Sequence, residues 1–497
     1  MNSSDKRPID VLIIGGFAPT TLTELEQMGT IYSPLTLLLS LSNKDSFQYS
    51  LPSVGPVALA SYLRKHDIQA KVMDFYFDEV KSFDSDIIGI SSTFLGIKNV
   101  IEISAIVRKE NPSAIIILGG PISWSISPEI LLREVPEIDY IVRGEGEQIF
   151  LELINTHCSK GNPHSVQGIA FREKDRIVET TLRVPLSFDN LPLPEWELMG
   201  IPCTERVPVL PIETSRGCPY NCVYCSEVTY WGKPVRYRSS TSVIEELLYN
   251  AEELGITTYR FTDSCFSAPT DRCEKLCDDI YTQLISNNTK INWSSYARIE
   301  NLSQSLLEKM KRAGCIALDI GLEAGSTQVL RKMGRGYSRE NAVQVAKAAR
   351  EVGIITNFNI VVGFPGETEE TVKETAEVIN EAAPNTFTSF IFFLTPNTRV
   401  YTHLEEYGLN GAGLSWKHNT MTSEQAIEAM YRIAQNVSES TCFPAGEQLA
   451  CGLSSIGYNK EQIEDFFKHI RTLSSNPNDC QALSQVKQVN DSFMKYW

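Results

Sequence analysis

Short apolar runs alternate with amphipathic segments along the first third of the chain. The runs have the length of buried strands, and the segments between them repeat apolar residues at helical spacing. This succession predicts an α/β domain with a doubly wound parallel sheet and helices on both of its faces. The expected strands are residues 11–14, 70–73, 87–91, 114–118 and 140–142, and the clearest helices are residues 54–65 and 98–109.

The same alternation starts again near residue 210. It comprises six units of strand and helix, whereas a complete barrel of this type has eight, so we expect a partial, open (β/α)6 barrel. Its functional groups should lie on the loops that follow the strands. The expected strands are residues 210–214, 259–262, 291–296, 316–321, 354–362 and 387–394, and the helices between them are residues 241–254, 271–285, 304–313, 339–352 and 369–382.

Proline-rich sequence and the changes of pattern divide the chain into four parts. A predicted hairpin ends the first part, and several prolines then mark a connector between domains. The last part is helical in pattern, and we expect it to cover one end of the barrel and the substrate. The expected parts are a first domain at residues 1–185, a proline-rich linker at 186–210, the partial barrel at 211–398 and a mainly helical region at 399–497.

Composition excludes several classes of protein. The chain has 497 residues, of which 42% are hydrophobic and 21% charged, as is typical of a folded globular protein. The net charge of −16 would repel a nucleic acid, so we expect no nucleic-acid partner. No apolar run approaches the ~20 residues that span a bilayer, and no signal peptide is apparent. We therefore expect a cytoplasmic protein without a membrane span.

Three cysteines lie on one loop, directly after the first expected strand of the barrel. Cys218, Cys222 and Cys225 have the spacing CxxxCxxC. Three thiolates at this spacing can bind three irons of a cubane cluster and leave the fourth iron open for chemistry. The alternative is zinc, but a closed zinc site needs four protein ligands, and the nearest other cysteines, Cys203 and Cys265, lie outside the loop. The spacing favours an iron–sulfur cluster.

The loop and the segments that follow it resemble the motifs of radical S-adenosylmethionine (SAM) enzymes. The resemblance implies that the three cysteines hold a catalytic [4Fe-4S] cluster whose open iron binds SAM. An electron from the cluster would cleave a carbon–sulfur bond of SAM and release a 5′-deoxyadenosyl radical that abstracts hydrogen from a substrate. The matching segments are Tyr224, before the last cysteine, and residues 237–239, 262–264, 321–326 and 363–367.

The resemblance also implies roles around SAM for individual residues. The alternatives are a helix cap or a solvated loop for Asp263 and Glu323, and an ion pair with a surface carboxylate for Arg298. The implied contacts are Glu323, Gly325 and Ser326 with the ribose and methionine part, Asp263 and Ser264 with the methionine amine, Arg298 with its carboxylate, and Gly363 with the adenine.

The first domain resembles the Rossmann-like cobalamin-binding domain that precedes the barrel in one branch of this superfamily. The matching segments are residues 51–55, 59–60, 90–93, 119–121 and 143–147. The implied cobalamin contacts are Gly15, Gly16, Ser91, Ser92, Thr93, Gly119, Gly120, Gly144, Glu145 and Gly146.

Alternatives remain for these positions. They can serve as ordinary strand-to-helix turns and caps. Because the glycines match neither GxGxxG nor GxxxxGK[ST], a nicotinamide or nucleoside triphosphate site has no support.

The histidines depart from the broader cobalamin-binding pattern. No Asp-x-His-x-x-Gly is present, and the chain reads Thr93-Phe94-Leu95-Gly96 after the third strand. A cobalt without a nitrogen ligand on its lower face should favour low oxidation states, which suit the capture of a methyl cation. The six histidines are His66, His157, His164, His403, His418 and His469, and we expect none of them at the strand ends of the first domain.

The other cysteines narrow the class further. The first is Cys158, so we expect no second cluster in the first domain of the kind that methylthiotransferases carry. Cys273 and Cys277 lie one helical turn apart and are expected in the core. Cys265 follows Asp263 closely and is expected to be a buried thiol, with contact to substrate as the alternative. Packing is also the expected role of Tyr230, Trp231, Trp416 and His418 near the cavity.

The resemblances together imply a cobalamin-dependent radical SAM enzyme. The favoured reaction is transfer of methyl from methylcobalamin to an unactivated carbon of a natural-product or peptide-type substrate, with an external electron donor such as flavodoxin or ferredoxin. One alternative is a cyclisation, rearrangement or oxidation that uses the same cofactors. A second, non-enzymatic alternative is a cluster and cobalamin sensor or an electron-transfer module, although no DNA-binding output domain is apparent.

Overall fold

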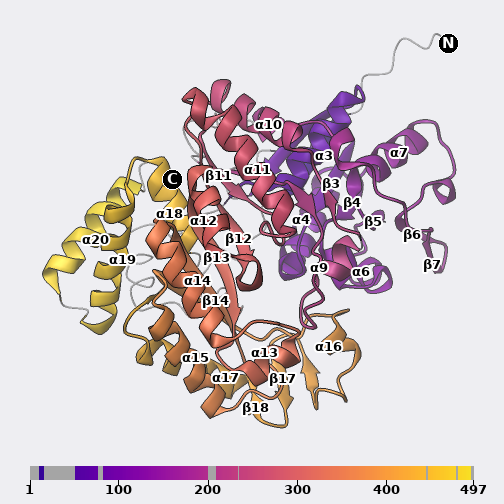
Figure 1. The fold of residues 1–497 in the computed structure, drawn as a ribbon. Coiled ribbons are helices and arrows are strands. Elements are labelled where there is room, and N and C mark those ends of the chain that lie inside the picture. Colours follow the sequence, from indigo (N-terminus) through magenta and orange to yellow (C-terminus); the bar gives the residue numbers. More distant parts are fainter. Residues whose placement is uncertain are drawn as a thin grey trace. The chain divides into compact units, whose positions relative to one another are not determined.

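The computed structural model describes residues 10–15, 51–75, 82–199, 209–232, 234–443, 446–476 and 479–493. The chain forms two compact units (Figure 1), of which Pro52–Arg206 makes up most of the first and Gly232–Trp497 most of the second. Each unit is built around one seven-stranded sheet. The predicted domain limits at residues 185, 210 and 398 stay predictions.

The sheet of the first unit contains all five predicted strands. Its order is β2-β1-β3-β4-β5-β6-β7; β1 to β5 run parallel, and the predicted hairpin, β6 and β7, extends the sheet with antiparallel strands. The strands are β1 (Asp10–Gly15), β2 (Gln69–Asp74), β3 (Ile87–Ser91), β4 (Ile115–Gly119), β5 (Tyr140–Val142), β6 (Ile169–Glu173) and β7 (Arg176–Glu179).

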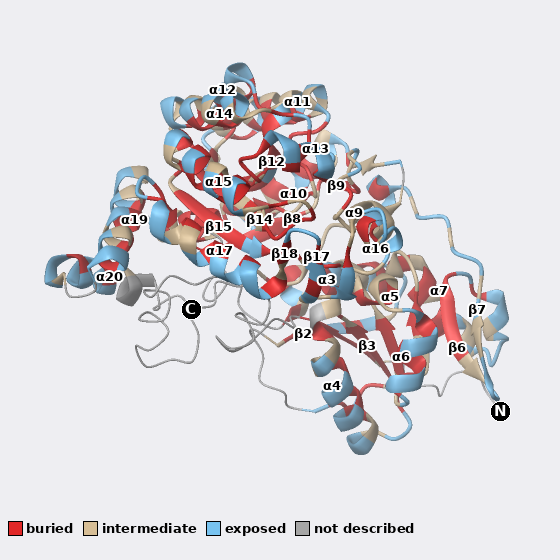
Figure 2. Ribbon diagram, turned by 90° about the horizontal axis from the view of Figure 1, so that it is seen from below, coloured by how far each residue is buried: buried red, intermediate tan, exposed pale blue. Residues whose placement is uncertain are grey.

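Helices cover both faces of this sheet, as the doubly wound prediction requires. Alternate side chains of a strand point to opposite faces. Leu12 therefore joins the buried cluster under α4 and α6, whereas Ile13 and Phe150 of α7 meet beside Gly89 on the other face. Figure 2 shows the strands as the buried layer between partly exposed helices. The helices are α3 (Val54–Lys65), α4 (Ile97–Glu110), α5 (Ile122–Ser125), α6 (Pro128–Glu134) and α7 (Gly146–Cys158).

The second unit is the expected open barrel. Its sheet is parallel throughout, in the order β19-β15-β14-β13-β12-β11-β8. The six predicted strands are β8 (Leu210–Ile212), β11 (Thr258–Phe261), β12 (Asn292–Arg298), β13 (Cys315–Glu323), β14 (Ile355–Val362) and β15 (Thr386–Ile391). The helices between them are α10 (Ser240–Glu252), α11 (Thr270–Gln283), α12 (Gln304–Arg312), α13 (Thr327–Met333), α14 (Arg339–Val352) and α15 (Glu369–Ala382).

The region after residue 398 is mainly helical, as predicted, but it also contains strands that the pattern did not indicate. Segments of two to four residues are too short for an alternating pattern to be read. These strands are β16 (Asn410–Ala412), β17 (Ser415–His418) and β18 (Met421–Thr422), which form a small antiparallel sheet, and β19 (Thr441–Cys442), which adds a seventh strand to the barrel. The helices are α16 (Arg399–Thr402), α17 (Ser423–Asn436), α18 (Gly446–Ser455), α19 (Lys460–Ser475) and α20 (Cys480–Phe493).

Helix α18 shows how the barrel is closed at one end. Its ten residues are about 15 Å long, whereas the five strands from β11 to β15 that it contacts would span roughly 19 Å if flat. One short helix thus lies against five strands, as in a sheet that curves around it. Gly446 lies against Thr386, the first residue of β15, so the helix fills the half of the barrel near the amino-terminal ends of the strands.

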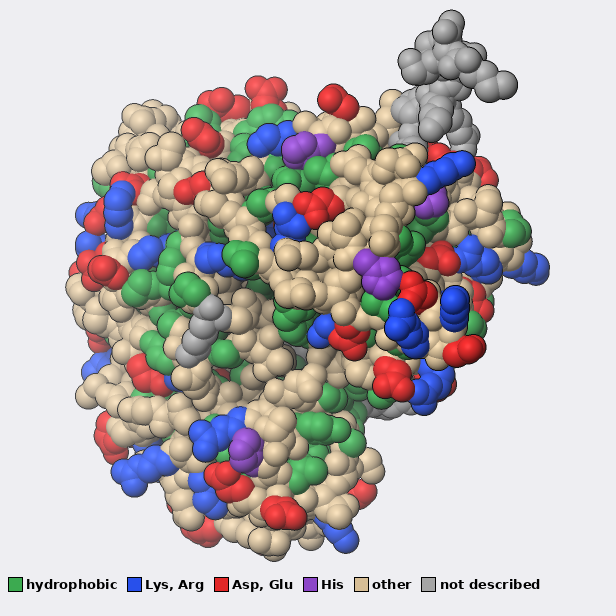
Figure 3. Space-filling model, turned by 90° about the vertical axis from the view of Figure 1, so that its right-hand side faces the viewer, with side chains coloured by type: hydrophobic (Ala, Val, Ile, Leu, Met, Phe, Trp, Pro, Cys, Tyr) green, Lys and Arg blue, Asp and Glu red, His purple; other side chains and the backbone are tan. Residues whose placement is uncertain are grey.

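The surface carries charges of both signs. On the face in Figure 3, Lys and Arg side chains are interspersed with Asp and Glu. Within the described part of the chain, no helix is both long and apolar enough to cross a bilayer.

Candidate radical SAM site

The cysteine loop leaves the barrel beyond β8 and the short strand β9 (Ser215–Arg216). Gly217 turns the chain with φ +105°, a conformation that favours glycine. The Val223 amide donates to the carbonyl of Met333, at the end of α13, at 3.2 Å, and the Val223 carbonyl accepts from Val400 of α16 at 3.1 Å. Two other elements of the unit thus fix the shape of the loop.

The donor set of this loop fits an iron–sulfur cluster. Cys218, Cys222 and Cys225 are half-buried and form no disulfide. Among the described residues, no three His, Cys, Asp or Glu side chains converge closely enough to bind one metal ion. A cubane does not need such convergence, because each thiolate binds a different iron.

Burial controls the protonation of two of these thiols. Removal from water raises the pKa of Cys218, and it raises the pKa of Cys225 to about 12 with a further contribution from Glu227. Both thiols therefore stay protonated at neutral pH until a metal displaces the proton. Binding of the cluster should release protons.

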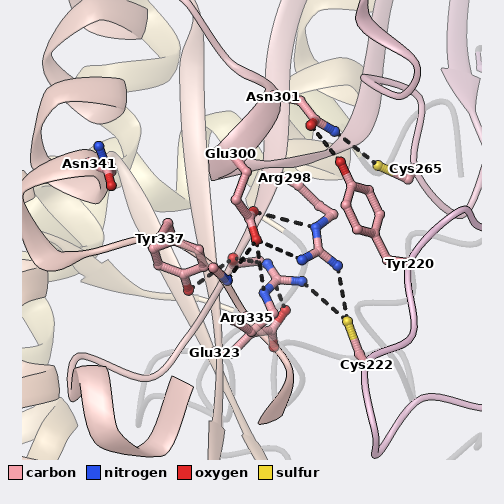
Figure 4. Close-up of polar contacts among 12 residues, drawn as sticks. Tyr220, Cys222, Cys265, Arg298, Glu300, Asn301, Glu323, Arg335, Tyr337 and Asn341 are labelled. Atoms are coloured by element: carbon pink, nitrogen blue, oxygen red, sulfur yellow. Dashed lines mark hydrogen bonds and ion pairs between the residues drawn. The ribbon is translucent and has the colours of Figure 1, made fainter. Parts of the chain in front are cut away.

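Arg298, at the end of β12, lies against the middle cysteine (Figure 4). Its Nη1 donates to Cys222 Sγ at 3.0 Å, Nη2 binds Glu300 at 2.7 Å, and the guanidinium stacks 3.7 Å from the ring centroid of Tyr220. The alternative for Arg298 was an ion pair with a surface carboxylate. An ion pair is present, but Arg298 is buried at the cysteine loop and not at the surface. Contact with the SAM carboxylate stays a prediction.

Arg335 is a second cation at this position, which sequence reasoning missed. Its Nη1 lies 3.8 Å from Cys222 Sγ, and its Nη2 donates to the Gly321 carbonyl at 2.7 Å and lies 3.5 Å from Glu323 (Figure 4). The sequence feature that could have identified Arg335 as a candidate is its position between Gly334 and Gly336, directly after α13. The two guanidinium groups can offset the negative charge of a thiolate-bound cluster at Cys222.

Glu323 ends β13 in a strained conformation. Its φ is +58°, which costs a non-glycine residue on the order of 1 kcal/mol and is most often retained at functional sites. Burial raises the pKa of its carboxyl, while Arg335 and a hydrogen bond from Tyr224 oppose that shift. Neither alternative for Glu323, a helix cap or a solvated loop, describes this position. A contact with SAM is compatible with it and stays a prediction.

Asp263 follows β11 and ties that strand to the beginning of the cysteine loop. The buried carboxylate accepts from the Thr214 hydroxyl at 2.6 Å, from the Thr214 amide at 3.2 Å and from the Ser215 hydroxyl. It is therefore neither a helix cap nor a solvated group. The neighbouring Ser264 hydroxyl donates to Glu227. These contacts favour a positioning role for Asp263, and its predicted contact with the methionine amine remains untested.

Gly363 follows β14 and lies beneath the small antiparallel sheet. A Cβ at this position would lie 2.4 Å from Trp416, and φ is +94°. The Gly363 amide donates to Glu367 at 2.5 Å, and its carbonyl is 3.1 Å from Nε2 of His418, whose ring stacks on Trp416. Trp416 and His418 thus pack as expected. Burial raises the pKa of Glu367 to about 8.

Gly325 and Ser326 connect β13 to α13. Ser326 is buried directly before the helix. The Gly325 amide donates to Thr375 Oγ1 at 2.9 Å, and a Cβ on Gly325 would lie 2.5–2.7 Å from backbone atoms of Glu374 and Thr375 in α15. Glycine is thus required here by close packing as well as by any contact with SAM.

The substitution Gly325→Ala should therefore destabilise the barrel by about 1–3 kcal/mol, because the helix backbone cannot move aside as a flexible side chain could. Urea unfolding followed by tryptophan fluorescence measures this change. Gly336→Ala is the matched control, since no atom lies within 4 Å of its added Cβ. Equal stability of the two variants would contradict the packing argument.

The predicted cobalamin residues of the first unit gather at one edge of its sheet. Gly15, Ser91 and Gly119 end the adjacent parallel strands β1, β3 and β4. Gly120 has φ +82°, and its Cβ would lie about 3 Å from atoms of Ser91 and Ser92. Thr93 follows these serines, and Gly144, Glu145 and Gly146 lead from β5 into α7, whereas Gly16 lies outside the described residues.

This arrangement is compatible with both sequence interpretations. The edge is where doubly wound sheets bind ligands, but the same residues also form turns and helix starts. The cobalamin contacts therefore stay predictions. The three histidines of this unit lie elsewhere: His66 caps the end of α3, His157 is in α7, and His164 follows α7.

Three further cysteines, Cys265, Cys273 and Cys277, are buried, as expected. Cys273 and Cys277 lie on the buried face of α11. Burial raises the pKa of Cys265 to about 12, and its Sγ lies 3.7 Å from Ser267 Oγ and 3.8 Å from Asn301 Nδ2. A thiol with such a pKa is a poor nucleophile at neutral pH. Tyr230 and Trp231, on the short helix after the cysteine loop, pack edge to face on each other.

Two family models match the chain. Residues 212–379 match the model of the radical SAM superfamily, and residues 43–154 match that of the B12 binding domain. Both lie where the two resemblances were noted in the sequence.

Curated relatives are similar over much of the chain. An uncharacterized methyltransferase of Pyrococcus horikoshii is 32% identical over 337 residues, which are 65% of this chain and 72% of the relative. The anaerobic magnesium-protoporphyrin IX monomethyl ester cyclase of Rubrivivax gelatinosus is 26% identical over 67% of this chain and 63% of its own length.

Solved structures share the fold. The radical SAM methyltransferase TsrM of Kitasatospora setae, determined with cobalamin and a [4Fe-4S] cluster, has a TM-score of 0.68 at 16% identity and covers 95% of this chain and 100% of its own. The cobalamin-dependent radical SAM enzyme OxsB, determined with aqua-cobalamin, has a TM-score of 0.65 at 15% identity and covers 98% of this chain and 80% of its own. At these identities the likeness supports the architecture alone.

Proposed function

We propose methyl transfer as the reaction of this chain, which belongs to the cobalamin-dependent branch of the radical SAM superfamily. The acceptor in this proposal is an unactivated carbon of a natural-product or peptide-type substrate. The observation that carries it is the match over 72% of the length of a relative described as a methyltransferase. When bound, SAM and the cluster supply a 5′-deoxyadenosyl radical, and cobalamin supplies the methyl group.

The residues of the barrel support the radical half of this reaction. Cys218, Cys222 and Cys225 would hold the cluster, and the guanidinium groups of Arg298 and Arg335 would offset its negative charge at Cys222. Glu323 and Ser264 would orient SAM. The electron would come from an external donor such as flavodoxin or ferredoxin.

A second candidate is a cyclisation or rearrangement with the same cofactors. The observation that favours it is the similarity to the protoporphyrin ester cyclase, which extends over 67% of this chain. The chain covers only 63% of that enzyme, and the identity is lower than with the methyltransferase relative.

Product analysis separates the two candidates. Reconstituted protein would be incubated with reductant, cobalamin, trideuteromethyl SAM and an anaerobic extract of the source cells that supplies the substrate. A methyltransferase should form both S-adenosylhomocysteine and 5′-deoxyadenosine, and one extract component should gain an intact trideuterated methyl group in the mass spectrum. A Cys222→Ala variant should give no 5′-deoxyadenosine.

Formation of 5′-deoxyadenosine without S-adenosylhomocysteine and without label would support the cyclase and exclude the methyltransferase. Absence of 5′-deoxyadenosine from the wild-type reaction would contradict both.

A further inference from the structure

The concave face of the second sheet has a buried half and an exposed half. Tyr296 of β12, Asp319 of β13 and Asn357 of β14 are register partners, so their side chains lie on the same face. Asp319 and Asn357 are buried near α18, whereas Tyr296 is 38% exposed. In β15, the register partner of Asn357 is Thr386. Phe390 follows Thr386 by four residues, so its side chain points to the same face, and it is likewise 38% exposed. Two large aromatic side chains thus line the part of the barrel interior that α18 leaves open.

A buried charge network supports the ring of Tyr296. The Arg260 guanidinium lies 4.1 Å from the ring centroid of Tyr296. It pairs with Asp319 at 3.4 Å and with Glu447 of α18 at 3.3 Å. Because two carboxylates hold the guanidinium and the guanidinium stacks on the ring, the ring is preorganised before any ligand arrives.

The polar groups of this floor are largely occupied by one another. Asp319 Oδ1 accepts from Asn357 at 2.8 Å and from Asn359 at 2.7 Å, and the Asn357 amide oxygen accepts from Thr386 at 2.8 Å. Asp319 Oδ1 and the Asn357 amide are therefore already engaged, and Glu447, whose oxygens accept no hydrogen bond among the described residues, is fully buried. The surfaces of Tyr296 and Phe390 remain available for binding by contact with an apolar group.

The exposed part of Tyr296 lies on the face of the sheet that α18 and the Arg260 network occupy. More than a third of the residue is accessible there, and burial of the rest raises the pKa of its hydroxyl. Arg298, two residues further on the same face of β12, contacts Cys222 Sγ. A group resting on the ring of Tyr296 therefore lies next to the cysteine loop.

We infer that Tyr296 and Phe390 form the walls of the substrate pocket and select a substrate with a planar, apolar group. This inference rests on the proposed function, which requires a substrate beside the cluster. Flat rings gain more from contact with aromatic walls than saturated rings of the same size, because they can stack or pack edge to face.

Two matched probes test this inference without a known substrate. Cluster-reconstituted protein would be titrated anaerobically with 2-naphthol, followed by its fluorescence, and decahydro-2-naphthol would compete as the saturated analogue. We expect the planar probe to bind about tenfold more tightly. Tyr296→Ala and Phe390→Ala should each weaken binding of 2-naphthol about tenfold, whereas Tyr296→Phe should bind nearly as the wild type does. Tyr431→Ala, which removes a 52% exposed tyrosine of α17, should change nothing.

The iron content of each variant serves as the test of folding. Weakened binding in the two Ala variants at unchanged iron content supports the pocket. Equal binding of both probes, or unchanged binding in both Ala variants, overturns it, as does loss of binding in Tyr431→Ala. A variant without iron is replaced by Tyr296→Leu or Phe390→Leu, which keep apolar volume and remove the ring. None of these results depends on methyl transfer, so failure here is distinct from failure of the proposed function.

Discussion

Replacing Cys218, Cys222 and Cys225 together with alanine should reduce bound iron from about four atoms per chain to nearly none and abolish formation of 5′-deoxyadenosine. The loop supplies the three thiol ligands, and the cationic groups that surround it cannot replace a thiolate as a ligand to iron. Iron and sulfide analysis after anaerobic reconstitution measures the first effect, and chromatography of the nucleoside products measures the second.

The control for this experiment is the pair Cys273→Ala and Cys277→Ala. This double variant also removes cysteine thiols, but from buried positions in α11 and not from the cysteine loop. It should therefore keep its full iron content. Iron that persists in the triple variant would refute the assignment of the loop. Equal loss in both variants would point to a general failure to assemble.

The strands could be predicted from apolar runs, but their ends could not. The run at residues 291–296 stops before β12 does, and the run at residues 316–321 stops before β13 does. The added residues include Arg298 and Glu323, which are polar because they face the site. In these two strands the hydrophobic pattern stops before polar residues that lie at the cysteine loop, whereas the runs at residues 210–214, 259–262 and 387–394 extend beyond the ends of β8, β11 and β15.

Candidate residues could be identified where they lie on one continuous motif. The cysteine loop and the segments at the ends of β13 and β14 follow strands directly, as expected, whereas the roles of their residues stay predictions. Arg335 and Glu300 were missed, because their meeting at the loop depends on where the chain returns after α13 and β12. The partners of Asp263 come from a neighbouring strand, and one sequence gives no strand register.

Arg260 offers the largest expected effect on stability. Its substitution by Met would leave the buried carboxylates of Asp319 and Glu447 without their cation, and both oxygens of Glu447 already have no hydrogen-bond donor among the described residues. Removing one partner of a buried ion pair costs about 3–5 kcal/mol, because the remaining charge is left in a medium that solvates it poorly. Urea unfolding at pH 8 should therefore show a marked fall in the midpoint.

The cost of Arg260→Met should shrink as the pH is lowered. In the wild type, burial raises the pKa of Asp319 to about 7, above the usual range of an aspartic acid, so the folded state takes up a proton more readily than the unfolded state. This carboxyl therefore contributes most to stability at low pH, and the contribution is lost as the pH rises from about 4 through about 7. Without the positive charge of Arg260, the Asp319 carboxyl of the folded variant should keep its proton up to a higher pH than in the wild type.

The variant should consequently lie closest to the wild type near pH 5.5 and furthest from it near pH 8. Arg312→Met is the matched control: Arg312 also pairs with an aspartate, Asp278 at 2.7 Å, and stacks 4.6 Å from the ring centroid of Tyr281, but its side chain is 49% exposed. Because water solvates the groups it leaves behind, the expected cost is below about 1 kcal/mol and nearly independent of pH in this range. Equal midpoints for the two variants at pH 8 would show that burial does not determine the strength of the Arg260 network. The argument that this network holds the ring of Tyr296 in place would then fail as well.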